Sequence, residues 1–334
     1  MKILYSGPLR AWSTTEARMK ALRALGHEVV PVDECRFLER GPRPVQMLQR
    51  HLLVGPGPAR YNRALVRATE ATRPDLVWID QGGQVRRQTV AALRATGARV
   101  LHYTSDSFAH RTYWFRHYFE ALDLYDVHVI TNELNRPFLE DRGVSRIVMS
   151  EFAYDPDLHR PPPFNGDDRR RDGSAAIFVG HWEPVSESLV LALREAGIDV
   201  RVHGPGWHRA RTLHDRRGIR PLHGTDYVAA LASAQLCLCF LSKPNRNQSA
   251  GRTFEIPAVG GFLLSERTAD QQTYFTEGTE AEYFSGRDEL IDKARFYLSH
   301  PQSRTAVAAA GHRRCTTSPY THTDRCRQIL QSLS

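Results

Sequence analysis

Short apolar segments alternate with amphipathic helical patterns along the chain, and this alternation is the strongest constraint on its fold. Strands interleaved with helices favour an α/β fold with parallel sheets joined by crossover connections. The expected strands lie at 2–7, 27–33, 75–80, 99–106, 126–132, 146–152, 175–181, 198–204, 235–242 and 261–266. The expected helices lie at 14–25, 39–72 (interrupted at 54–58), 84–96, 186–196, 225–234, 287–299, 301–313 and 320–333.

The pattern is interrupted once, at HRPPPFNGDDRRRDGS (159–174), which is rich in Pro, Gly and charge and has little to bury. The 334 residues suit two domains, at about 100–200 residues each. We therefore predict Rossmann-like domains at 1–160 and 175–319, a linker at 161–174, and a helix at 320–334 that packs back on the first domain. We expect the ligand to bind in a cleft where the two domains face each other, beyond the carboxyl ends of the strands.

Composition indicates a soluble globular enzyme, with 41% hydrophobic and 25% charged residues. No run of 18 apolar residues predicts a membrane span, and MKILYSGPL does not resemble a signal peptide. The five cysteines are an odd number without a CxxC pair, and Cys237 and Cys239 are expected on one face of a buried strand. This usage favours reduced thiols in a cytoplasm and no metal site.

The net charge of +8 and the pI near 9.4 come mainly from arginine, with clusters at 167–172 and 209–220. A basic surface attracts polyanions, the anionic face of a membrane, or an anionic small substrate such as a nucleotide. The alternative is a solvated arginine-rich surface. A nucleic-acid-binding protein is a further alternative, but no such motif occurs and we expect no nucleic acid partner.

Two common nucleotide-binding motifs are absent. In the second half no G-x-G-x-x-G opens a helix after the first strand, and no G-x-x-x-x-G-K-[ST] is present. Strands of the second half do end in glycine, at Gly180, Gly204 and Gly224, and glycine there lets backbone amides approach a phosphate. Every α/β turn favours glycine, so this feature alone does not identify a ligand.

Glu255 is unusual because it lies in an otherwise apolar run, GRTFEIPAVGG (251–261). A buried carboxylate needs a partner. At the start of a helix it could accept hydrogen bonds from the 2′ and 3′ hydroxyls of a ribose, while Arg252 binds a diphosphate. The alternative is an ion pair between Arg252 and Glu255 at i,i+3 spacing.

NRNQSAGRTFEIPAVGGFLLSE, with the later TEAEYFSGRDEL and AAAGHRR, resembles the carboxyl half of the CgeB-like (spore maturation protein B-like) glycosyltransferases, over about 175–330. This resemblance implies the GT-B fold and a hexosyltransferase. Its nucleoside-diphosphate-sugar donor, a UDP-sugar in preference, would be bound by the second domain. A glycan, lipid or small-molecule acceptor would be bound mostly by the first. It also implies that no metal or other cofactor is needed.

By position, Glu255 is similar to the second glutamate of the E-x7-E motif of retaining GT-B enzymes. The first glutamate falls at position 247, where this chain has Asn247. Asn247 or Gln248 could still hydrogen-bond a sugar hydroxyl. A sugar-nucleotide epimerase of similar architecture and an inactive donor-binding relative remain alternatives.

Further donor-site candidates follow strands of the second half: Gly180, His181, Trp182, Gly204, Trp207, Tyr227 and Lys243. The resemblance implies that Gly180-His181-Trp182 lies against the diphosphate. Gly204, Trp207 and Tyr227 are expected near the base. Lys243 is expected at a phosphate, or else in solvent.

In the first half, YTSDSFAHR (103–111) ends a strand, so Asp106 and His110 are expected to face the ligand. Asp106 could orient or deprotonate an acceptor hydroxyl. Alternatively, Asp106 caps the helical pattern that follows, and the two roles are compatible. We expect His102 to be structural and the aromatic run at 113–119 to pack as a helix face.

Overall fold

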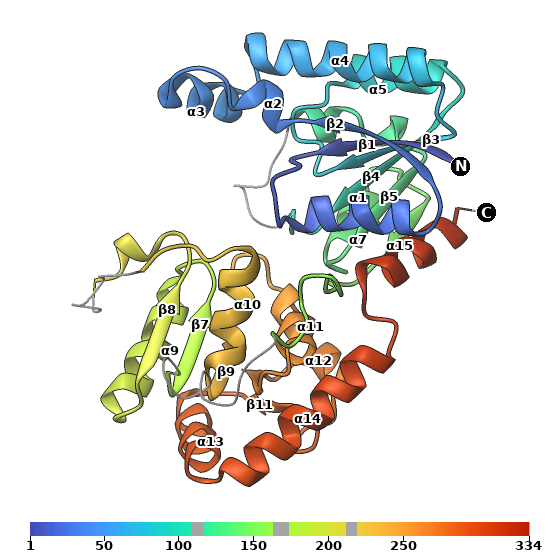
Figure 1. Ribbon diagram of the computed structural model, residues 1–334. Coiled ribbons are helices and arrows are strands. Elements are labelled where there is room, and N and C mark those ends of the chain that lie inside the picture. The colour runs from blue at the N-terminus through green and yellow to red at the C-terminus, as the bar shows by residue number, and fades with distance from the viewer. Residues whose placement is uncertain (109–115, 163–173, 212–218, 334) are drawn as a thin grey trace. The chain divides into compact units, whose positions relative to one another are not determined.

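The computed structural model of the chain contains two compact units, each built on one parallel sheet (Figure 1). The structure describes residues 1–108, 116–162, 174–211 and 219–333. The first unit comprises Met1–Glu151 and His322–Ser334, and the second comprises Phe152–Thr321. The α/β prediction of two Rossmann-like units is confirmed.

The sheet of the first unit has the strand order β2-β1-β3-β4-β5-β6, with every pair parallel. Its strands are β1 (Lys2–Gly7), β2 (Glu28–Asp33), β3 (Leu76–Asp80), β4 (Arg99–Thr104), β5 (Val127–Ile130) and β6 (Ile147–Met149). Its described helices are α1 (Thr14–Ala24), α2 (Cys35–Leu38), α3 (Arg43–Leu52), α4 (Pro56–Thr72), α5 (Arg87–Ala95), α6 (Arg116–Glu120), η2 (Leu122–Leu124), α7 (Asn135–Glu140) and α15 (His322–Gln331).

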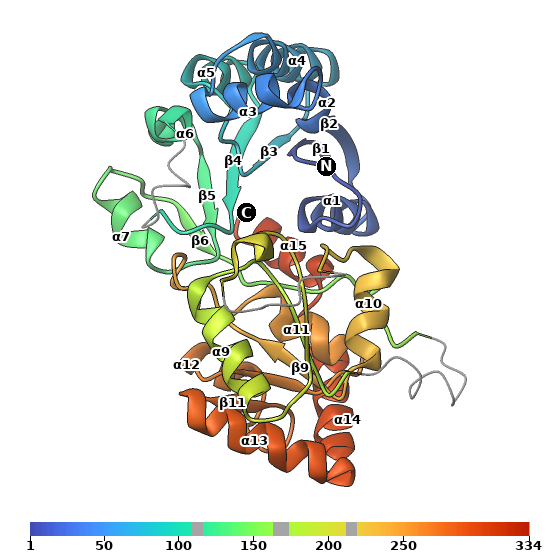
Figure 2. The same ribbon diagram turned by 90° about the vertical axis from the view of Figure 1, so that its left-hand side faces the viewer.

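Alternating residues of the first sheet enter two separate cores, as the two-residue period of a strand requires. Leu4 packs with Leu65 of α4 and Leu93 of α5, whereas Ile3 packs with Leu22 of α1 and Ile329 of α15. Figure 2 shows α4 and α5 on one side of β3 and β4, with α1 and α15 on the other.

A buried ion pair ties α1 to the carboxyl end of β3. Arg18 is 5% exposed, and its Nε and Nη2 donate to the Asp80 carboxylate at 2.7 and 3.1 Å. The Tyr5 hydroxyl donates to Asp80 Oδ2 at 2.6 Å. The Arg18 guanidinium also lies 4.1 Å from the centre of the Tyr103 ring. The cation is therefore neutralised, hydrogen-bonded and stacked, which offsets the cost of burying it.

The sheet of the second unit has the order β11-β10-β9-β7-β8 and is also parallel throughout. Its strands are β7 (Ala176–Val179), β8 (Val200–His203), β9 (Leu236–Cys239), β10 (Leu263–Glu266) and β11 (Glu282–Phe284). Its described helices are α9 (Pro184–Glu195), η3 (Trp207–Arg209), α10 (Gly224–Ser233), α11 (Gly251–Ala258), α12 (Ala269–Tyr274), α13 (Arg287–Ser299) and α14 (Pro301–Thr317).

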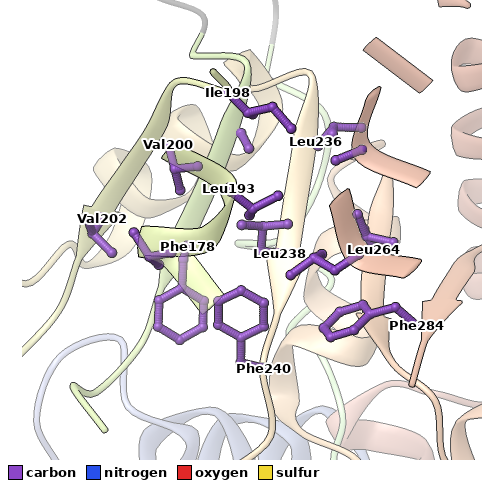
Figure 3. Close-up of a cluster of buried hydrophobic side chains, with 14 of the residues drawn as sticks. Phe178, Leu193, Ile198, Val200, Val202, Leu236, Leu238, Phe240, Leu264 and Phe284 are labelled. Atoms are coloured by element: carbon purple, nitrogen blue, oxygen red, sulfur yellow. The ribbon is translucent and has the colours of Figure 1, made fainter. Parts of the chain in front are cut away.

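Two cores again cover the two faces of this sheet. One contains side chains of α9 and α13, and Figure 3 shows its Phe178 and Phe240 rings side by side, with centroids 4.7 Å apart. The other contains side chains of α10, α11 and α12 together with Cys237 and Cys239. The expectation that these two cysteines share a face of a buried strand is confirmed. All five cysteines are free thiols.

The first unit ends earlier in the chain than position 160. Phe152, Tyr154 and Leu158 pack into the core of the second unit, and Tyr154 forms a parallel bridge with Thr321. The predicted linker at 161–174 lies almost entirely outside the described residues. Helix α15 packs on α1, where the Cys326 thiol lies 3.8 Å from the Arg18 carbonyl.

Some elements of the second unit differ from the sequence expectations, and α12 is a helix that was not expected. EYF at 282–284 forms the edge strand β11, although three residues are too few to show a period. Helix α14 continues to Thr317, past the expected end at 313. Within the described residues, no helix has both the length and the apolar character needed to cross a bilayer.

Arg18→Met tests the buried ion pair, because it leaves the Asp80 charge buried without its cation. We expect a loss of about 3–5 kcal/mol in the free energy of unfolding, measured by urea titration. Arg36→Met is the matched control. Arg36 is 78% exposed and pairs with Asp33 at 3.7 Å, and exposed ion pairs contribute little to the free energy of unfolding. Equal losses in the two variants would contradict this account.

Candidate active site

The carboxyl ends of β7 and β9 are joined by the side chain of Arg252, in the first turn of α11. Its Nη1 donates to the Val179 carbonyl at 2.8 Å and its Nη2 to the Phe240 carbonyl at 3.0 Å. The guanidinium lies 5.3 Å from the centre of the Phe178 ring. The planar guanidinium of arginine can donate to two acceptors at once, which lysine cannot do in the same geometry, so this position favours arginine.

Glycine at the ends of β7 and β8 permits this arrangement. A Cβ on Gly180 would lie 2.9 Å from Arg252 Nη1, and a Cβ on Gly204 would lie 2.0 Å from the Gly180 carbonyl oxygen. Gly204 also has φ +135°, a conformation that other residues rarely adopt. The close approach that these glycines allow is therefore between parts of the protein itself.

Trp207 requires a correction, because it was expected near a nucleotide base. Its side chain is 1% exposed and belongs to the core beside α9. Its indole Nε1 donates to the Gly180 carbonyl at 2.9 Å. Trp207 thus fixes the loop after β7 and has no free face for a ligand.

Glu255 extends back over the first turn of its own helix. A Cβ on Gly251 would lie 2.8 Å from Glu255 Oε1, so only glycine leaves room for the carboxylate there. Glu255 Oε2 accepts a hydrogen bond of 2.5 Å from the Tyr227 hydroxyl of α10. Burial, together with the charge of Glu255, raises the pKa of Tyr227 well above its usual value. Tyr227 therefore stays protonated and donates to the carboxylate.

The alternative ion pair between Arg252 and Glu255 does not form. Arg252 is bound to strand carbonyls, and Glu255 is bound to Tyr227. The N-cap residue of α11, Ala250, has no side chain that can accept from the helix, although its own N–H donates to the Thr253 hydroxyl at 3.1 Å. Within the described structure the amides of Gly251 and Arg252 have no side-chain partner. Backbone amides in the first turn of a helix bind anions in many proteins.

Three other predicted residues lie near this edge of the sheet. His181 has a lowered pKa because of partial burial and the positive Arg252 nearby, so it is neutral at pH 7. The Trp182 indole donates to Glu187 at 2.7 Å, and its ring is covered by Arg209 at 4.5 Å. Lys243 Nζ donates to Glu266 at 2.5 Å and is half-exposed. None of these contacts tests the predicted phosphate or base roles.

A hollow of about 390 Å³ lies at the ends of β9, β10 and β11, within the size range of small-ligand pockets. Asn247 and Gln248 line it, and so do Glu266, Arg267 and Thr268. Sequence reasoning missed these last three residues. Glu266 ends β10 and the other two directly follow it, so the rule that selected the ends of β7 and β8 could have found them.

Arg267 is the centre of a charged network beside this hollow. It donates to both oxygens of Glu277 and to both oxygens of Glu289. Lys293 pairs with Glu277 and with the buried Glu282. Hydrogen bonds from Arg267 lower the pKa of Glu277 and of Glu289 to about 2. The network fixes the loop after β10 to β11 and α13.

In the first unit, Asp106 follows β4 and is half-buried. Burial and the negative charge of Asp80 raise the pKa of Asp106 to about 6. Its backbone N–H reaches Thr104 and its carbonyl accepts from Asn135, but among the described residues its carboxylate has no hydrogen-bond partner. His110 lies outside the described residues, as does the start of the helix that Asp106 was expected to cap.

His102 has the structural role expected for it. It stacks on Tyr118 at 3.9 Å, and its Nε2 lies 2.9 Å from the Gln81 carbonyl. Burial and the neighbouring His128 lower the pKa of His102 to about 3, so it is neutral. Across the parts of the chain that the structure describes, no three His, Cys, Asp or Glu side chains are grouped to hold a metal ion.

Solved structures of similar fold cover almost the whole chain. Anabaena Alr3699/HepE, solved in complex with UDP-glucose, has a TM-score of 0.67 at 10% identity and covers 100% of this chain and 99% of its own. Sucrose-phosphate synthase from Thermosynechococcus elongatus has a TM-score of 0.66 at 12% identity, with 99% and 97% covered. The fold is GT-B. A UDP-N-acetylglucosamine 2-epimerase of Listeria monocytogenes, itself a provisional assignment, has a TM-score of 0.58 at 14% identity, with 99% and 95% covered.

Sequence comparison adds a family match within this GT-B chain. Residues 183–331 match the model of the family described as glycosyl transferase-like. No curated protein is significantly similar in sequence. The matched segment includes α11 with Arg252 and Glu255, the loop after β10, and the Arg267 network.

Arg267→Gln tests the charged network through its pH dependence. Both glutamate pKa values lie below the ordinary 4.5, so their ion pairs stabilise the fold above about pH 5 and are lost as the pH falls toward 2. We expect the variant to melt at a lower temperature at pH 7 and to lose less stability on acidification. Arg287→Gln, which removes an exposed pair with Glu195, is the control. Parallel curves of melting temperature against pH for wild type and Arg267→Gln would contradict the prediction.

Proposed function

We propose that the chain is a glycosyltransferase that moves a sugar from a nucleoside-diphosphate sugar to a hydroxyl-bearing acceptor. The observation that carries this proposal is the arrangement at the amino end of α11. The Gly251 and Arg252 amides, which have no side-chain partner in the described structure, lie there with the Arg252 guanidinium and the Glu255 carboxylate. A nucleoside diphosphate has both groups that such a site would bind, an anion for the amides and ribose hydroxyls for the carboxylate.

Glu255 would accept hydrogen bonds from the ribose hydroxyls while Tyr227 holds its other oxygen. Arg252 uses one N–H of each terminal nitrogen on the strand carbonyls, and its buried Nε has no partner within the described structure. The second N–H of each terminal nitrogen would stabilise the diphosphate as it leaves. The helix dipole of α11 adds to this effect, so we propose that transfer needs no metal.

The donor we favour is a UDP-sugar. The family match at 183–331 supports a sugar-transfer enzyme, and HepE, of the same fold, was solved with UDP-glucose. Asn247 and Gln248 would then bind the sugar in the hollow beside Arg267. The similarity of Glu255 to the motif of retaining GT-B enzymes implies transfer with retention of configuration, which NMR of the product anomer would test.

A sugar-nucleotide epimerase is the second candidate, because UDP-N-acetylglucosamine 2-epimerases share this fold. Such an enzyme would convert the nucleotide sugar without any acceptor. Incubation with the donor alone, followed by analysis of the sugar nucleotide, distinguishes the two. Conversion of the sugar without an acceptor would favour the epimerase.

Glu255→Ala removes the proposed ribose contacts. Two hydrogen bonds to a charged group contribute roughly 1.5–3 kcal/mol each, so we expect UDP to bind at least about 100-fold more weakly by calorimetry. Tyr227→Phe should weaken binding less, because it removes only the group that orients the carboxylate. Asp288→Ala, which removes an exposed carboxylate of the same unit, should leave binding unchanged. Equal UDP affinity in Glu255→Ala and wild type would refute the ribose role.

Asp106→Asn tests the proposal that Asp106 deprotonates or orients the acceptor. Because the pKa of Asp106 is raised in the folded state, its ionisation lowers the free energy of unfolding as the pH rises from about 4 through 6. The variant should therefore be more stable than wild type at pH 8, by about 1–3 kcal/mol, and equally stable near pH 4. It should also lose roughly 100-fold or more in turnover. A stability gain with full activity would contradict a role of Asp106 in the reaction.

A further inference from the structure

Helix α3 of the first unit turns two polar side chains, those of Gln46 and Gln49, toward the protein. The Gln46 side-chain amide donates to the carbonyls of Glu39 and Gly41 at 3.0 and 2.8 Å. Gln49 is 7% exposed, and its side-chain oxygen accepts from the Gly57 amide at 2.7 Å. Figure 1 shows α3 beyond α2, at the outer side of its unit and away from the sheet.

Most apolar side chains of this segment face solvent, although Leu53 is buried. Five of the eleven large apolar side chains that are exposed among the described residues lie here, and we call them the α3 patch: Val45, Met47, Leu48, Leu52 and Val54. Met47 is 72% exposed and Leu48 is 58% exposed. A helix of a soluble protein normally has the opposite orientation, with its apolar side toward the core. Clustered exposed apolar side chains are typical of surfaces that bind another protein or a membrane.

The chain around the α3 patch is strongly basic. Residues 40–69 contain six arginines and no aspartate or glutamate. Arg40 and Arg43, on either side of the start of α3, are exposed and form no ion pair within the described structure. Helices that lie on anionic bilayers have this composition, with exposed apolar side chains bordered by basic residues.

We propose that α3 docks the protein on an anionic membrane surface. Met47, Leu48 and Leu52 would enter the boundary between headgroups and acyl chains, and Arg40 and Arg43 would contact the anionic headgroups. This inference is independent of the proposed function, because it uses none of the residues assigned to the donor or the acceptor.

A second copy of the chain fits the α3 patch less well. In a symmetric dimer the same surface of each copy forms the interface. The arginines of residues 40–69 would then face those of the other copy, with no aspartate or glutamate in this segment to neutralise them. The helix has ten residues and is about 15 Å long, whereas a stable interface buries about 800 Å² on each partner. An anionic bilayer complements both the charge and the apolar side chains.

The experiment is flotation of the full-length protein with vesicles, either pure phosphatidylcholine or containing about one-third phosphatidylglycerol. We expect binding only to the anionic vesicles, and weaker binding as salt rises. Met47→Ser/Leu48→Ser should lower the partition coefficient by about tenfold or more. Arg43→Gln should lower it by about fivefold.

The controls change matched exposed residues elsewhere on the chain. Leu134→Ser/Val185→Ser removes two apolar side chains that are 49% and 41% exposed, and Arg313→Gln removes one exposed charge. Both controls should bind as wild type does. Unchanged binding of Met47→Ser/Leu48→Ser, or equal loss in both apolar variants, would overturn the proposal. A third outcome would also overturn it: the wild type binds no vesicles but self-associates, and Met47→Ser/Leu48→Ser abolishes that self-association. The α3 patch would then bind a second copy of the chain.

Discussion

The hydrogen bonds from Arg252 to the carbonyls of Val179 and Phe240 hold the candidate site together. They join the ends of two neighbouring strands to the first turn of α11, so the register of the sheet fixes the position of the helix. Gly180 and Gly204 leave the space that this contact needs, and the Trp207 indole donates a hydrogen bond to the Gly180 carbonyl. A guanidinium held in this way is positioned before any ligand arrives, which is what electrostatic stabilisation of a leaving group requires.

The position of Glu255 follows from the same helix. An otherwise apolar run has one carboxylate because α11 buries its other side chains, Phe254 and Ile256 among them, against β7 and β9. Glu255 instead turns toward the amino end of α11, where the helix dipole favours a negative charge. Tyr227 orients one of its oxygens. The carboxylate is therefore stabilised locally without neutralising Arg252.

Much of the fold could be predicted from the sequence because strand and helix periods are local signals. The sheets, the shared face of Cys237 and Cys239, and the structural role of His102 all follow from residue order and type. Trp207 could not be placed, because burial of an indole depends on how the β7 and β8 loops meet in space. The partners of Lys243 and the Arg267 network were hidden for the same reason, since they join residues from separate strands and helices. The α3 patch is visible only when the inward hydrogen bonds of Gln46 and Gln49 are known.

The most direct test of the central claim, that the carboxyl edge of the second unit binds a nucleoside diphosphate, is thermal unfolding against a ligand panel. The panel contains UDP, GDP, dTDP, CDP, NAD and a short oligonucleotide. A ligand present at about 100 times its dissociation constant adds roughly 2.7 kcal/mol of stability, enough to raise the melting temperature by several degrees. We predict such a rise with one nucleoside diphosphate, UDP in preference. No rise with any nucleoside diphosphate, or a rise with the oligonucleotide alone, would contradict the account.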